Sequence, residues 1–322
     1  MTGPDGLRWG IAGYGDVVVR RALPAFAALG QEVTGIWGRR PGRAAEVARR
    51  SGAGRAFPSY TALLDAVDAV YVATPVASHE PLASAALEAG RHVLVEKPLG
   101  GGLPYDRARL TTAAAGPAVS AVAYYRRLAP VWLAVRELIR DRGPLRIAVS
   151  FRAVFEPGPG DPMYWRTVRE VSGGGVLADA GSHRLDILCW LLGPPVTSRA
   201  SLAGRFPGGA ERVARLALSW TDGSRARLNC EWAASGPARD RVRIAGHDLD
   251  IRLADAGTGV ISLRKSKAVT RRKLPMAANP LVPVLRDFLS CVADGREPAC
   301  TLAGAMLADD LIRSASCPAG PA

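Results

Sequence analysis

The stretch Ile11-Ala12-Gly13-Tyr14-Gly15-Asp16-Val17-Val18 determines the fold that this sequence predicts. It joins an apolar run, which is typical of a buried strand, to a segment with helical spacing. Gly13 permits a tight turn, and Gly15 lets the backbone approach a pyrophosphate at the N-terminus of a helix. Val18 replaces the third glycine of the usual G-x-G-x-x-G pattern. We predict a dinucleotide-binding turn formed by Gly13, Tyr14, Gly15, Asp16 and Val17.

Short apolar runs alternate with helical segments over the first 120 residues. Strands are expected at 7–12, 33–37, 69–73, 92–95 and 118–123, and helices at 16–29 (interrupted by Pro24), 43–50, 79–89 and 105–115. Alternating helices and buried strands are typical of a parallel, doubly wound sheet of the Rossmann type. The α/β pattern therefore predicts a first domain at 1–123 that binds NAD(P).

The pattern changes after Tyr124, where strands follow one another without intervening helices. Strands are expected at 145–155, 213–221, 225–232, 241–245, 248–253 and 260–263, and helices at 130–140, 176–192, 280–294 and 302–314. Strands in direct succession favour an open, mainly antiparallel sheet. We expect an α+β domain at 124–322 that binds substrate and forms oligomers.

Composition narrows the class of protein. The chain has 322 residues, enough for about two domains, and no apolar stretch approaches the roughly 18 residues of a membrane span. Residues 1–7 are polar, which does not predict a secretory signal. The cysteines lack paired spacing: Cys189, Cys230, Cys291, Cys300 and Cys317. We expect reduced thiols in a cytoplasmic protein that has no metal site and no membrane partner.

The net charge of +13 admits two interpretations. One is nucleic-acid binding through a basic surface, and the other is an arginine-biased composition combined with anionic small-molecule ligands. The arginines occur as singles and pairs along the whole chain, apart from a modest cluster at Arg264 to Lys273. Because no nucleic-acid-binding motif accompanies them, we predict no nucleic-acid partner.

Lys97 stands out in a chain whose 42 basic residues include only four lysines. It is the only lysine among the first 264 residues, and it lies in Glu96-Lys97-Pro98 directly after the expected strand at 92–95. An ammonium group is a compact charge with a tunable pKa, whereas a guanidinium is a planar fork that hardly deprotonates. The lysine therefore marks a candidate functional residue at the end of a strand.

Two arginines follow the second expected strand. An NAD-selective site usually places an acid there to bind the ribose 2′-hydroxyl, but this chain has Gly38-Arg39-Arg40. A guanidinium can bind a phosphate through two parallel hydrogen bonds. The segment favours NADP over NAD, although both arginines could also be solvated loop charges.

The glycine-rich segment 173–186 contains Asp179 and His183, four residues apart. On a helix these side chains share a face. Histidine titrates near neutral pH and can exchange a proton with a hydroxyl, and a carboxylate one turn away can orient it. The pair is a candidate acid–base group, although Gly181 between them lowers helix propensity.

Together these motifs resemble the Gfo/Idh/MocA oxidoreductase family, which includes glucose–fructose oxidoreductase and inositol 2-dehydrogenase. The resemblance extends over nearly the whole chain and rests on Gly13-Tyr14-Gly15, Ala73-Thr74-Pro75 with Ser78-His79, Glu96-Lys97-Pro98, Ala123 to Arg127, Tyr164-Trp165-Arg166, Gly173 to Asp186 and Asn279 to Pro298. It implies hydride transfer between a nicotinamide and a carbinol or carbonyl carbon, usually of a sugar or cyclitol.

The resemblance also implies residue roles. His183 would exchange the proton with support from Asp179, and Lys97 would hydrogen-bond the reacting oxygen. The cofactor contacts would be Thr74, Pro75, His79, Glu96, Trp165 and Arg166, besides the turn and Arg39 and Arg40; Tyr125 and Arg126 would lie near substrate. In this family the open face of the second sheet normally forms oligomers, which implies a homodimer or homotetramer.

Two alternatives remain. A noncatalytic dinucleotide sensor on the same fold would not need Lys97, Asp179 and His183 together. A reductase of another class of substrate, such as a tetrapyrrole or dihydrodiol, is less consistent with the Asp179–His183 pair, which favours hydroxyl and ketone chemistry.

Overall fold

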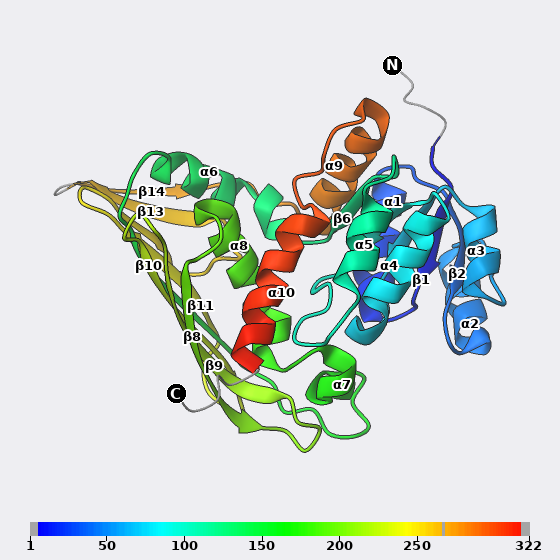
Figure 1. The fold of residues 1–322 in the computed structure, drawn as a ribbon, viewed down its shortest axis with the longest axis horizontal. Helices are drawn as coiled ribbons and strands as arrows, with labels where there is room; N and C mark the ends of the chain where they lie inside the picture. The colour runs from blue at the N-terminus through cyan, green and yellow to red at the C-terminus, as the bar shows by residue number, and fades with distance from the viewer. Residues whose placement is uncertain (1–5, 266–267, 317–322) are drawn as a thin grey trace. The chain divides into compact units, whose positions relative to one another are not determined.

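The computed structural model describes residues 6–265 and 268–316, which divide into two units (Figure 1). Cys317 and Lys267 lie outside the described residues. The first unit comprises 6–100, Pro104–Tyr125 and Ala277–Ala305, and the second comprises Gly101–Leu103, Arg126–Met276 and 306–316. The chain thus passes to the second unit after Tyr125 and returns to the first unit for residues 277–305.

The first unit contains a six-stranded parallel sheet in the order β3-β2-β1-β4-β5-β6. Its strands are β1 (Trp9–Ala12), β2 (Val33–Trp37), β3 (Arg55–Ala56), β4 (Ala69–Val72), β5 (His92–Val95) and β6 (Ser120–Val122). The order reverses at β1 and β4, which is the arrangement of a doubly wound dinucleotide-binding sheet. The α/β prediction is confirmed, although β3 was not expected.

The helices of this unit are the π-helix η1 (Val18–Ala22), α1 (Leu23–Ala28), α2 (Pro41–Ser51), α3 (Tyr60–Ala66), the 3-10 helix η2 (Val76–Ser78), α4 (His79–Glu88), α5 (Arg107–Ala114) and α9 (Leu281–Asp294). Pro24 has no backbone N–H to donate, and the turn just before it is the π-helix. The buried ring of Phe288 on α9 lies 5.4 Å from the ring of Trp9 on β1. The core of the first sheet therefore includes a helix from near the C-terminus.

The second unit contains an eight-stranded sheet in the order β14-β13-β12-β11-β7-β10-β9-β8. Its strands are β7 (Arg146–Val154), β8 (Thr197–Arg205), β9 (Glu211–Ser219), β10 (Arg225–Ala233), β11 (Arg239–Ala245), β12 (Asp250–Leu253), β13 (Val260–Lys265) and β14 (Ala268–Lys273). Among the named strands of this sheet within the described residues, β7 and β10 are the one pair that runs parallel. The mainly antiparallel prediction is confirmed. The two edge strands β8 and β14 were not expected, because they are mostly exposed and lack alternating apolar residues.

Helices cover one face of this sheet, where α6 (Pro130–Ile139) and α8 (Ser182–Leu192) lie (Figure 1). The remaining helices of the unit are the short η3 (Tyr125–Leu128), η4 (Tyr164–Thr167), α7 (Arg169–Ser172) and η5 (Leu177–Gly181), and most of α10 (Leu302–Ser316). Buried aliphatic side chains such as Leu216, Leu228 and Val242 point to the covered face.

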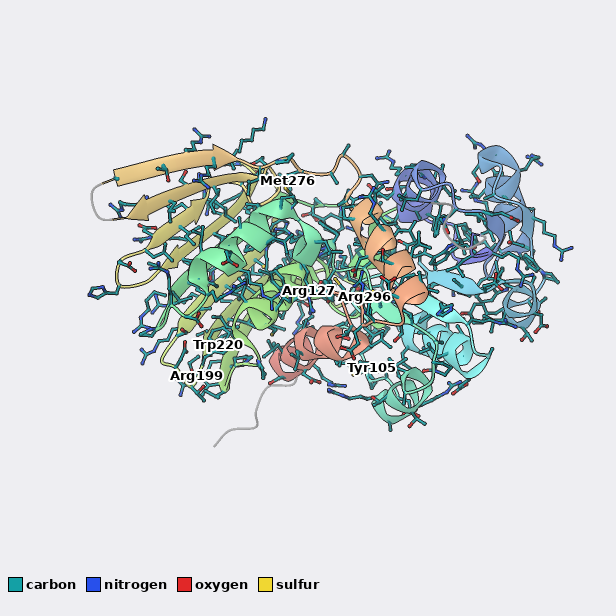
Figure 2. All side chains as sticks on the ribbon, turned by 90° about the horizontal axis from the view of Figure 1, so that it is seen from above. Tyr105, Arg127, Arg199, Trp220, Met276 and Arg296 are labelled. Atoms are coloured by element: carbon teal, nitrogen blue, oxygen red, sulfur yellow. The ribbon has the colours of Figure 1, made fainter. Side chains whose placement is uncertain are left out.

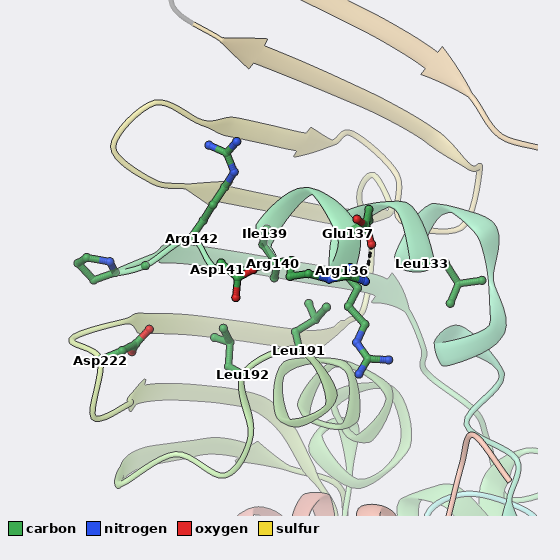
Figure 3. Close-up of a pocket in the computed structure, with 12 residues that line it drawn as sticks. Leu133, Arg136, Glu137, Ile139, Arg140, Asp141, Arg142, Leu191, Leu192 and Asp222 are labelled. Atoms are coloured by element: carbon green, nitrogen blue, oxygen red, sulfur yellow. Dashed lines mark ion pairs between the residues drawn. The ribbon is translucent and has the colours of Figure 1, made fainter.

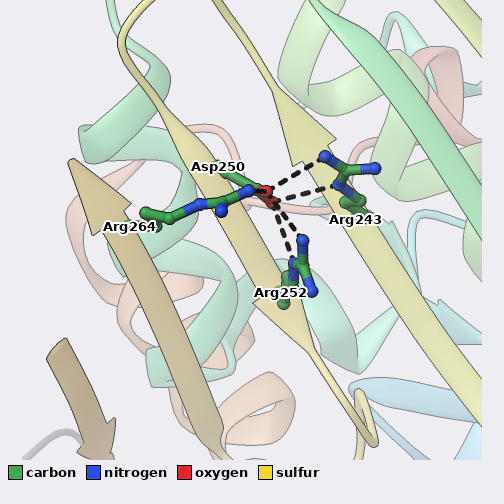
Figure 4. A network of polar contacts seen from close by, with 4 residues as sticks. All are labelled: Arg243, Asp250, Arg252 and Arg264. Carbon is green, nitrogen blue, oxygen red and sulfur yellow. Dashed lines mark hydrogen bonds and ion pairs between the residues drawn. The ribbon is translucent and has the colours of Figure 1, made fainter. Parts of the chain in front are cut away.

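The opposite face carries the alternate residues of each strand, and its charged residues are mainly basic. We call it the arginine face. Its cations are Arg146, Arg152, Arg199, Arg215, Arg225, Arg227, Arg239, Arg241, Arg243, Arg252, Arg264, Arg271 and Lys273, and its acids are Glu231 and Asp250. Figure 2 shows the side chains on the ribbon, with Arg199 labelled on β8. Asp250 accepts hydrogen bonds from Arg243, Arg252 and Arg264 on this face (Figure 4).

The described cysteines Cys189, Cys230, Cys291 and Cys300 are all buried free thiols. Burial raises the pKa of the Cys189 and Cys230 thiols to about 12, so these groups stay protonated and unreactive. Within the described ranges, no helix is long and apolar enough to cross a membrane, and no cluster of three or more His, Cys, Asp or Glu side chains could hold a metal ion.

Candidate functional site

The sequence-predicted site residues come from both units. Tyr125 and all the residues expected to bind cofactor before it lie in the first unit. Arg126, Trp165, Arg166, Asp179 and His183 lie in the second. Lys97 therefore belongs to a different unit from the other two predicted catalytic residues.

The turn after β1 requires glycine at its first position. Gly13 has a φ of +120°, and a Cβ added there would lie 2.4 Å from the carbonyl oxygen of Ala73, directly after β4. Its N–H donates to the carbonyl oxygen of Trp37 at 2.8 Å. Val18, at the third position of the glycine pattern, is fully buried in the core. The turn is thus packed against the carboxyl ends of both neighbouring strands, β2 and β4.

Tyr14 links this turn to the loop after β2. Its ring packs so closely on Gly38 that a Cβ there would lie 2.2 Å from the ring. The Tyr14 hydroxyl also accepts a hydrogen bond from the backbone N–H of Arg40 at 3.2 Å. Tyr14 therefore fixes the position of the loop that carries Arg39 and Arg40.

Arg39 and Arg40 are exposed at the N-terminus of α2, where Arg40 is the N-cap residue. Neither has an acidic partner among the described residues. The N-terminus of a helix carries partial positive charge and free N–H groups. Both features suit a phosphate.

Asp16 and Val17, the last two residues of the predicted dinucleotide-binding turn, make contacts that do not by themselves indicate a ligand. Asp16 forms an exposed ion pair with Arg20 at 2.9 Å, and Val17 is partly buried at the start of the helix. Gly15 has open space where a Cβ would stand. This leaves room for close approach of a ligand to the backbone at Gly15.

His79 joins the loops that follow β4 and β5. Its ring is 1% exposed, with Nε2 lying 2.7 Å from the carbonyl oxygen of Thr74 and Nδ1 lying 2.8 Å from that of Pro98. Burial lowers the pKa of His79, against the effect of the two carbonyl contacts. The buried ring of His79 therefore connects these two loops.

Glu96 precedes Lys97 at the carboxyl end of β5. Its carboxylate accepts hydrogen bonds from the Tyr71 hydroxyl at 2.5 Å and from the backbone N–H of Lys97 at 3.2 Å. Burial and the neighbouring carboxylate raise the pKa of Tyr71 well above its ordinary value, so it remains a donor. In doubly wound sheets ligands bind outside the carboxyl ends of the strands, which is where Thr74, Pro75 and Lys97 lie.

In the second unit, Glu211 fixes the glycine-rich segment. The carboxylate of this buried residue accepts hydrogen bonds from the N–H groups of Gly175 at 2.7 Å and Leu177 at 2.9 Å. A Cβ on Gly175 would lie 1.9 Å from the backbone oxygen of Glu211. Glu211 could not be predicted from the sequence, because nothing within the sequence connects an acid at the start of β9 to a segment 34 residues away or more.

Asp179 lies in the π-helical turn η5, immediately before α8. Its carboxylate pairs with Arg166 on η4 at 2.9 Å, and the Arg166 guanidinium carbon is 5.5 Å from the centre of the Trp165 ring. The Ser182 hydroxyl donates to the backbone oxygen of Asp179 at 2.8 Å. The structure therefore brings the predicted catalytic residue Asp179 together with Arg166 and Trp165, which were predicted to contact the cofactor.

His183 is 7% exposed in the first turn of α8, next to a group of buried charges. Arg126 and Arg184 each pair with Asp240 at 2.7 Å. Burial opposes ionisation of Asp240, but the two guanidinium groups outweigh it and hold the pKa of the carboxyl below its ordinary value. Arg126, predicted to lie near substrate, is thus also part of a charged network that supports α8.

A second buried pair joins Arg127 to Asp186, also on α8, at 2.5 Å. Burial raises the pKa of Asp186 to about 6, although Arg127 opposes the rise. This ion pair was not predicted from the sequence. Opposite charges that meet only in the folded chain leave no local sequence signal.

The second unit also has a surface hollow of about 930 Å³ between the ends of α6 and α8 (Figure 3). Arginines and leucines, including Arg136, Arg140 and Leu191, line it. None of the predicted site residues does so. The hollow is therefore not the predicted catalytic site.

The comparisons with known proteins give the same family for both halves of the chain. Residues 7–116 match the model of an oxidoreductase family with an NAD-binding Rossmann fold, and residues 132–252 match the GFO/IDH/MocA C-terminal domain. The chain belongs to the Gfo/Idh/MocA oxidoreductase family.

Its relatives include named sugar-nucleotide enzymes. A dTDP-3,4-didehydro-2,6-dideoxy-alpha-D-glucose 3-reductase from Streptomyces violaceoruber is 36% identical over 61% of this chain and 57% of that protein. A UDP-N-acetylglucosamine 3-dehydrogenase from Acidithiobacillus ferrooxidans is 29% identical over 91% of each chain. The crystal structure of a 3-ketoreductase from Actinomadura kijaniata with NADP and TDP-benzene is 26% identical, has a TM-score of 0.83 and is covered over 97% of each chain. The chain thus spans little more than half the length of the Streptomyces reductase but matches the other two almost completely.

Proposed function

We propose that this protein is an NADP-dependent oxidoreductase that transfers hydride between the nicotinamide and a ketone or secondary alcohol of a sugar, nucleotide sugar or cyclitol. The observation that carries the proposal is the set of contacts that fixes the turn of Asp179 and orients its carboxylate. Glu211 fixes the start of its helical turn, and Arg166 pairs with its carboxylate at 2.9 Å. A protein that only sensed a dinucleotide would not need a carboxylate oriented in this way one turn before a buried histidine.

The residues of the first unit fit a phosphorylated dinucleotide. Gly13 permits the tight turn, and Gly15 leaves the backbone accessible near a helix N-terminus, which suits a pyrophosphate. The exposed Arg39 and Arg40, without acidic partners among the described residues, suit a 2′-phosphate. The buried hydroxyl of Thr74 has no hydrogen-bond partner in the described chain, which leaves it available to a bound cofactor.

The bound nicotinamide would supply or accept the hydride. Following the family resemblance, His183 exchanges the proton with the reacting oxygen, and Asp179 supports it. Lys97 donates a hydrogen bond to that oxygen and stabilises the negative charge that develops there during reduction. Arg166 orients Asp179, and Glu96 anchors the backbone N–H of Lys97.

The named relatives support a keto sugar carried on a nucleotide as the first substrate class to test. Two of them act on sugars bearing dTDP or UDP, and the structure of a third contains TDP-benzene. Reduction by NADPH is the expected direction, since NADPH is generally the reducing form in cells. We place the reaction in the cytoplasm.

The decisive experiment measures NADPH and NADH oxidation by absorbance against keto nucleotide sugars, keto sugars and keto cyclitols. Lys97→Ala should lower kcat about 10²- to 10³-fold, as the loss of one donor to a developing oxyanion does elsewhere. Lys273→Ala, which removes an exposed lysine of the second unit, is the matched control and should retain parental turnover. Tight NADPH binding without turnover on any substrate would favour the sensor instead.

The cofactor preference has its own test. Arg39→Asp should weaken NADPH binding far more than NADH binding, because the new carboxylate repels the 2′-phosphate and can accept a hydrogen bond from a 2′-hydroxyl. Cofactor fluorescence titrations measure both affinities. Equal losses for the two cofactors would remove Arg39 from the proposed phosphate site.

A further inference from the structure

Gly38 is the first residue after β2 and precedes the exposed Arg39 and Arg40. It is buried, but its backbone conformation does not require glycine, because its φ lies outside the left-handed region. The space around it does require glycine. A Cβ added there would lie 2.2 Å from Cε1 and 2.6 Å from Cδ1 of the Tyr14 ring. The ring of Tyr14 therefore occupies the place that a side chain at position 38 would take.

Tyr14 also contacts the start of α2. Its hydroxyl accepts a hydrogen bond from the backbone N–H of Arg40, the N-cap residue of that helix, at 3.2 Å. The carbonyl oxygen of Arg40 in turn accepts the N–H groups of Arg43 at 3.0 Å and Ala44 at 3.1 Å. One side chain of the glycine turn thus fixes both the end of β2 and the first turn of α2.

The acid of an NAD-selective site would have to share this space. In doubly wound sheets the turn after the first strand binds the pyrophosphate, and an acid at the end of the second strand binds the ribose 2′-hydroxyl. The two segments are adjacent here, since the N–H of Gly13 donates to the carbonyl oxygen of Trp37 at 2.8 Å. A side chain at position 38 would leave the backbone towards Tyr14. A carboxylate there could reach the ribose only if the ring moved or were replaced by a smaller group.

We propose that Tyr14 determines the cofactor preference, because it excludes an acid from position 38 and holds the backbone of Arg40 in place for a 2′-phosphate. The inference rests on the proposed NADP-dependent function and adds a specificity-determining residue to it. The 2′-hydroxyl of NAD finds no carboxylate at the end of β2. The 2′-phosphate of NADP meets Arg39 and Arg40, whose guanidinium groups suit it.

The proposal makes positions 14 and 38 a coupled pair. If charge alone decided the preference, Gly38→Asp by itself would turn the protein towards NADH. If the ring decides it, that single substitution forces a collision with Tyr14. Only Tyr14→Ala combined with Gly38→Asp then gives the acid the space that it needs. The effects of the two substitutions should therefore not add.

The test is a double-mutant cycle, in which fluorescence titrations measure the affinities for NADPH and NADH with no substrate present. The cycle comprises the parent, Tyr14→Ala, Gly38→Asp and the double variant. Gly38→Ala is the matched control, because it adds the crowded Cβ without the charge. Tyr14→Phe combined with Gly38→Asp is the second control, because it keeps the ring and removes the hydroxyl that Arg40 contacts. Circular dichroism checks that each variant folds.

We expect the parent to bind NADPH more tightly than NADH, and both Gly38→Asp and Gly38→Ala to weaken the binding of both cofactors. The double variant should bind NADH about tenfold or more tightly than Tyr14→Ala does, because a hydrogen bond to a carboxylate is strong. It should bind NADPH about tenfold or more weakly than Tyr14→Ala does, because the carboxylate repels the 2′-phosphate. The phenylalanine combination should gain no affinity for NADH, since its ring still excludes the acid.

Three results would overturn the role of Tyr14 while NADP dependence stands. The first is a Gly38→Asp variant that turns to NADH as strongly as the double variant. The second is the same gain of NADH affinity in the phenylalanine combination. The third is a folded double variant that binds NADH no better than Tyr14→Ala. A parent without preference for NADPH would overturn both this proposal and the NADP dependence of the proposed function.

Discussion

The segment that carries Lys97 and the segment that carries Asp179 are held in place by different kinds of contact. In the first unit, the buried ring of His79 lies between two backbone carbonyl oxygens, and the Tyr71 hydroxyl donates a hydrogen bond to Glu96. In the second unit, charged side chains make most of the contacts that hold the Asp179 segment. Glu211 binds the N–H groups at the start of η5, and Arg166 pairs with Asp179.

The difference follows from what surrounds each segment. The loops after parallel strands lie next to one another, so backbone groups and one buried ring can join them. The Asp179 turn instead opens a helix, whose first N–H groups lack partners within the helix and attract an acid. We therefore expect the second unit to respond to changes of charge that leave the first unit unaffected.

The largest effect should come from adding a methyl group at Gly13 or Gly175, the crowded glycines of the two segments. Gly13→Ala and Gly175→Ala each place a Cβ within 2.4 Å of a backbone oxygen, and neither backbone can move cheaply. Each substitution should lower the free energy of unfolding by more than about 3 kcal/mol. Urea denaturation followed by circular dichroism measures the loss.

Two open glycines serve as controls for these substitutions. Gly15 and Gly160 have nothing within 4 Å of an added Cβ, so alanine at either should change stability by less than about 1 kcal/mol. Gly15→Ala should nevertheless weaken NADPH binding, because its methyl group would stand where the pyrophosphate approaches. A large loss of stability in either control would contradict the crowding argument.

Replacing Glu211 or His79, the side chains that hold the two segments in place, should lower the free energy of unfolding by an intermediate amount. Glu211→Gln leaves one of two buried N–H groups without an acceptor and should cost about 1–3 kcal/mol of unfolding free energy. His79→Gln alters the one N–H donation that an uncharged imidazole can make to these carbonyl oxygens and should cost about 1 kcal/mol. If His79→Gln proves the more costly, the contrast between the two segments is wrong.

The pH dependence of the free energy of unfolding should reveal a buried acid of the second unit, Asp186. The folded chain protonates Asp186 below about pH 6, whereas the unfolded chain does so near its ordinary value of 3.8. Between these values the folded state holds more protons, so this group's contribution to stability falls as pH rises from 4 to 6, by up to about 1.4 kcal/mol per unit. Asp186→Asn should abolish that slope. An identical pH profile for parent and variant would show that the pKa of Asp186 is not raised.

The smallest effect should come from an exposed ion pair. Arg20→Gln removes the contact with Asp16, in which the side chains are 77% and 45% exposed. Solvent screening keeps the stabilising free energy of such exposed ion pairs near zero. The change in unfolding free energy should therefore stay within about 0.5 kcal/mol. Thermal melts at low and high salt would reveal a larger effect.

Local patterns in the sequence predicted the buried elements well. The strands β2 and β5 begin and end where their apolar runs do. The edge strands β8 and β14 lack such a run, and β3 has only two residues. Burial, which produces the pattern, is missing in these strands, so periodicity could not find them.

The residues of the candidate site also differ in whether the sequence predicts them. Gly13, Lys97 and Asp179 stand in short motifs that can be read along the chain. Their supports cannot, because Glu211 and Arg166 reach their partners only after folding. The arginine face is the extreme case, since only the strand registers show which arginines are neighbours.

The return of residues 277–305 to the first unit has a consequence for how the protein is made. Phe288 completes the packing around Trp9, and the carbonyl of Cys300 accepts a hydrogen bond from the N–H of Val122. A ribosome must therefore add almost the whole chain before the N-terminal sheet can gain its last layer. During that interval an unfinished apolar surface stays open to chaperones, and a fragment that stops at residue 123 would keep that surface exposed.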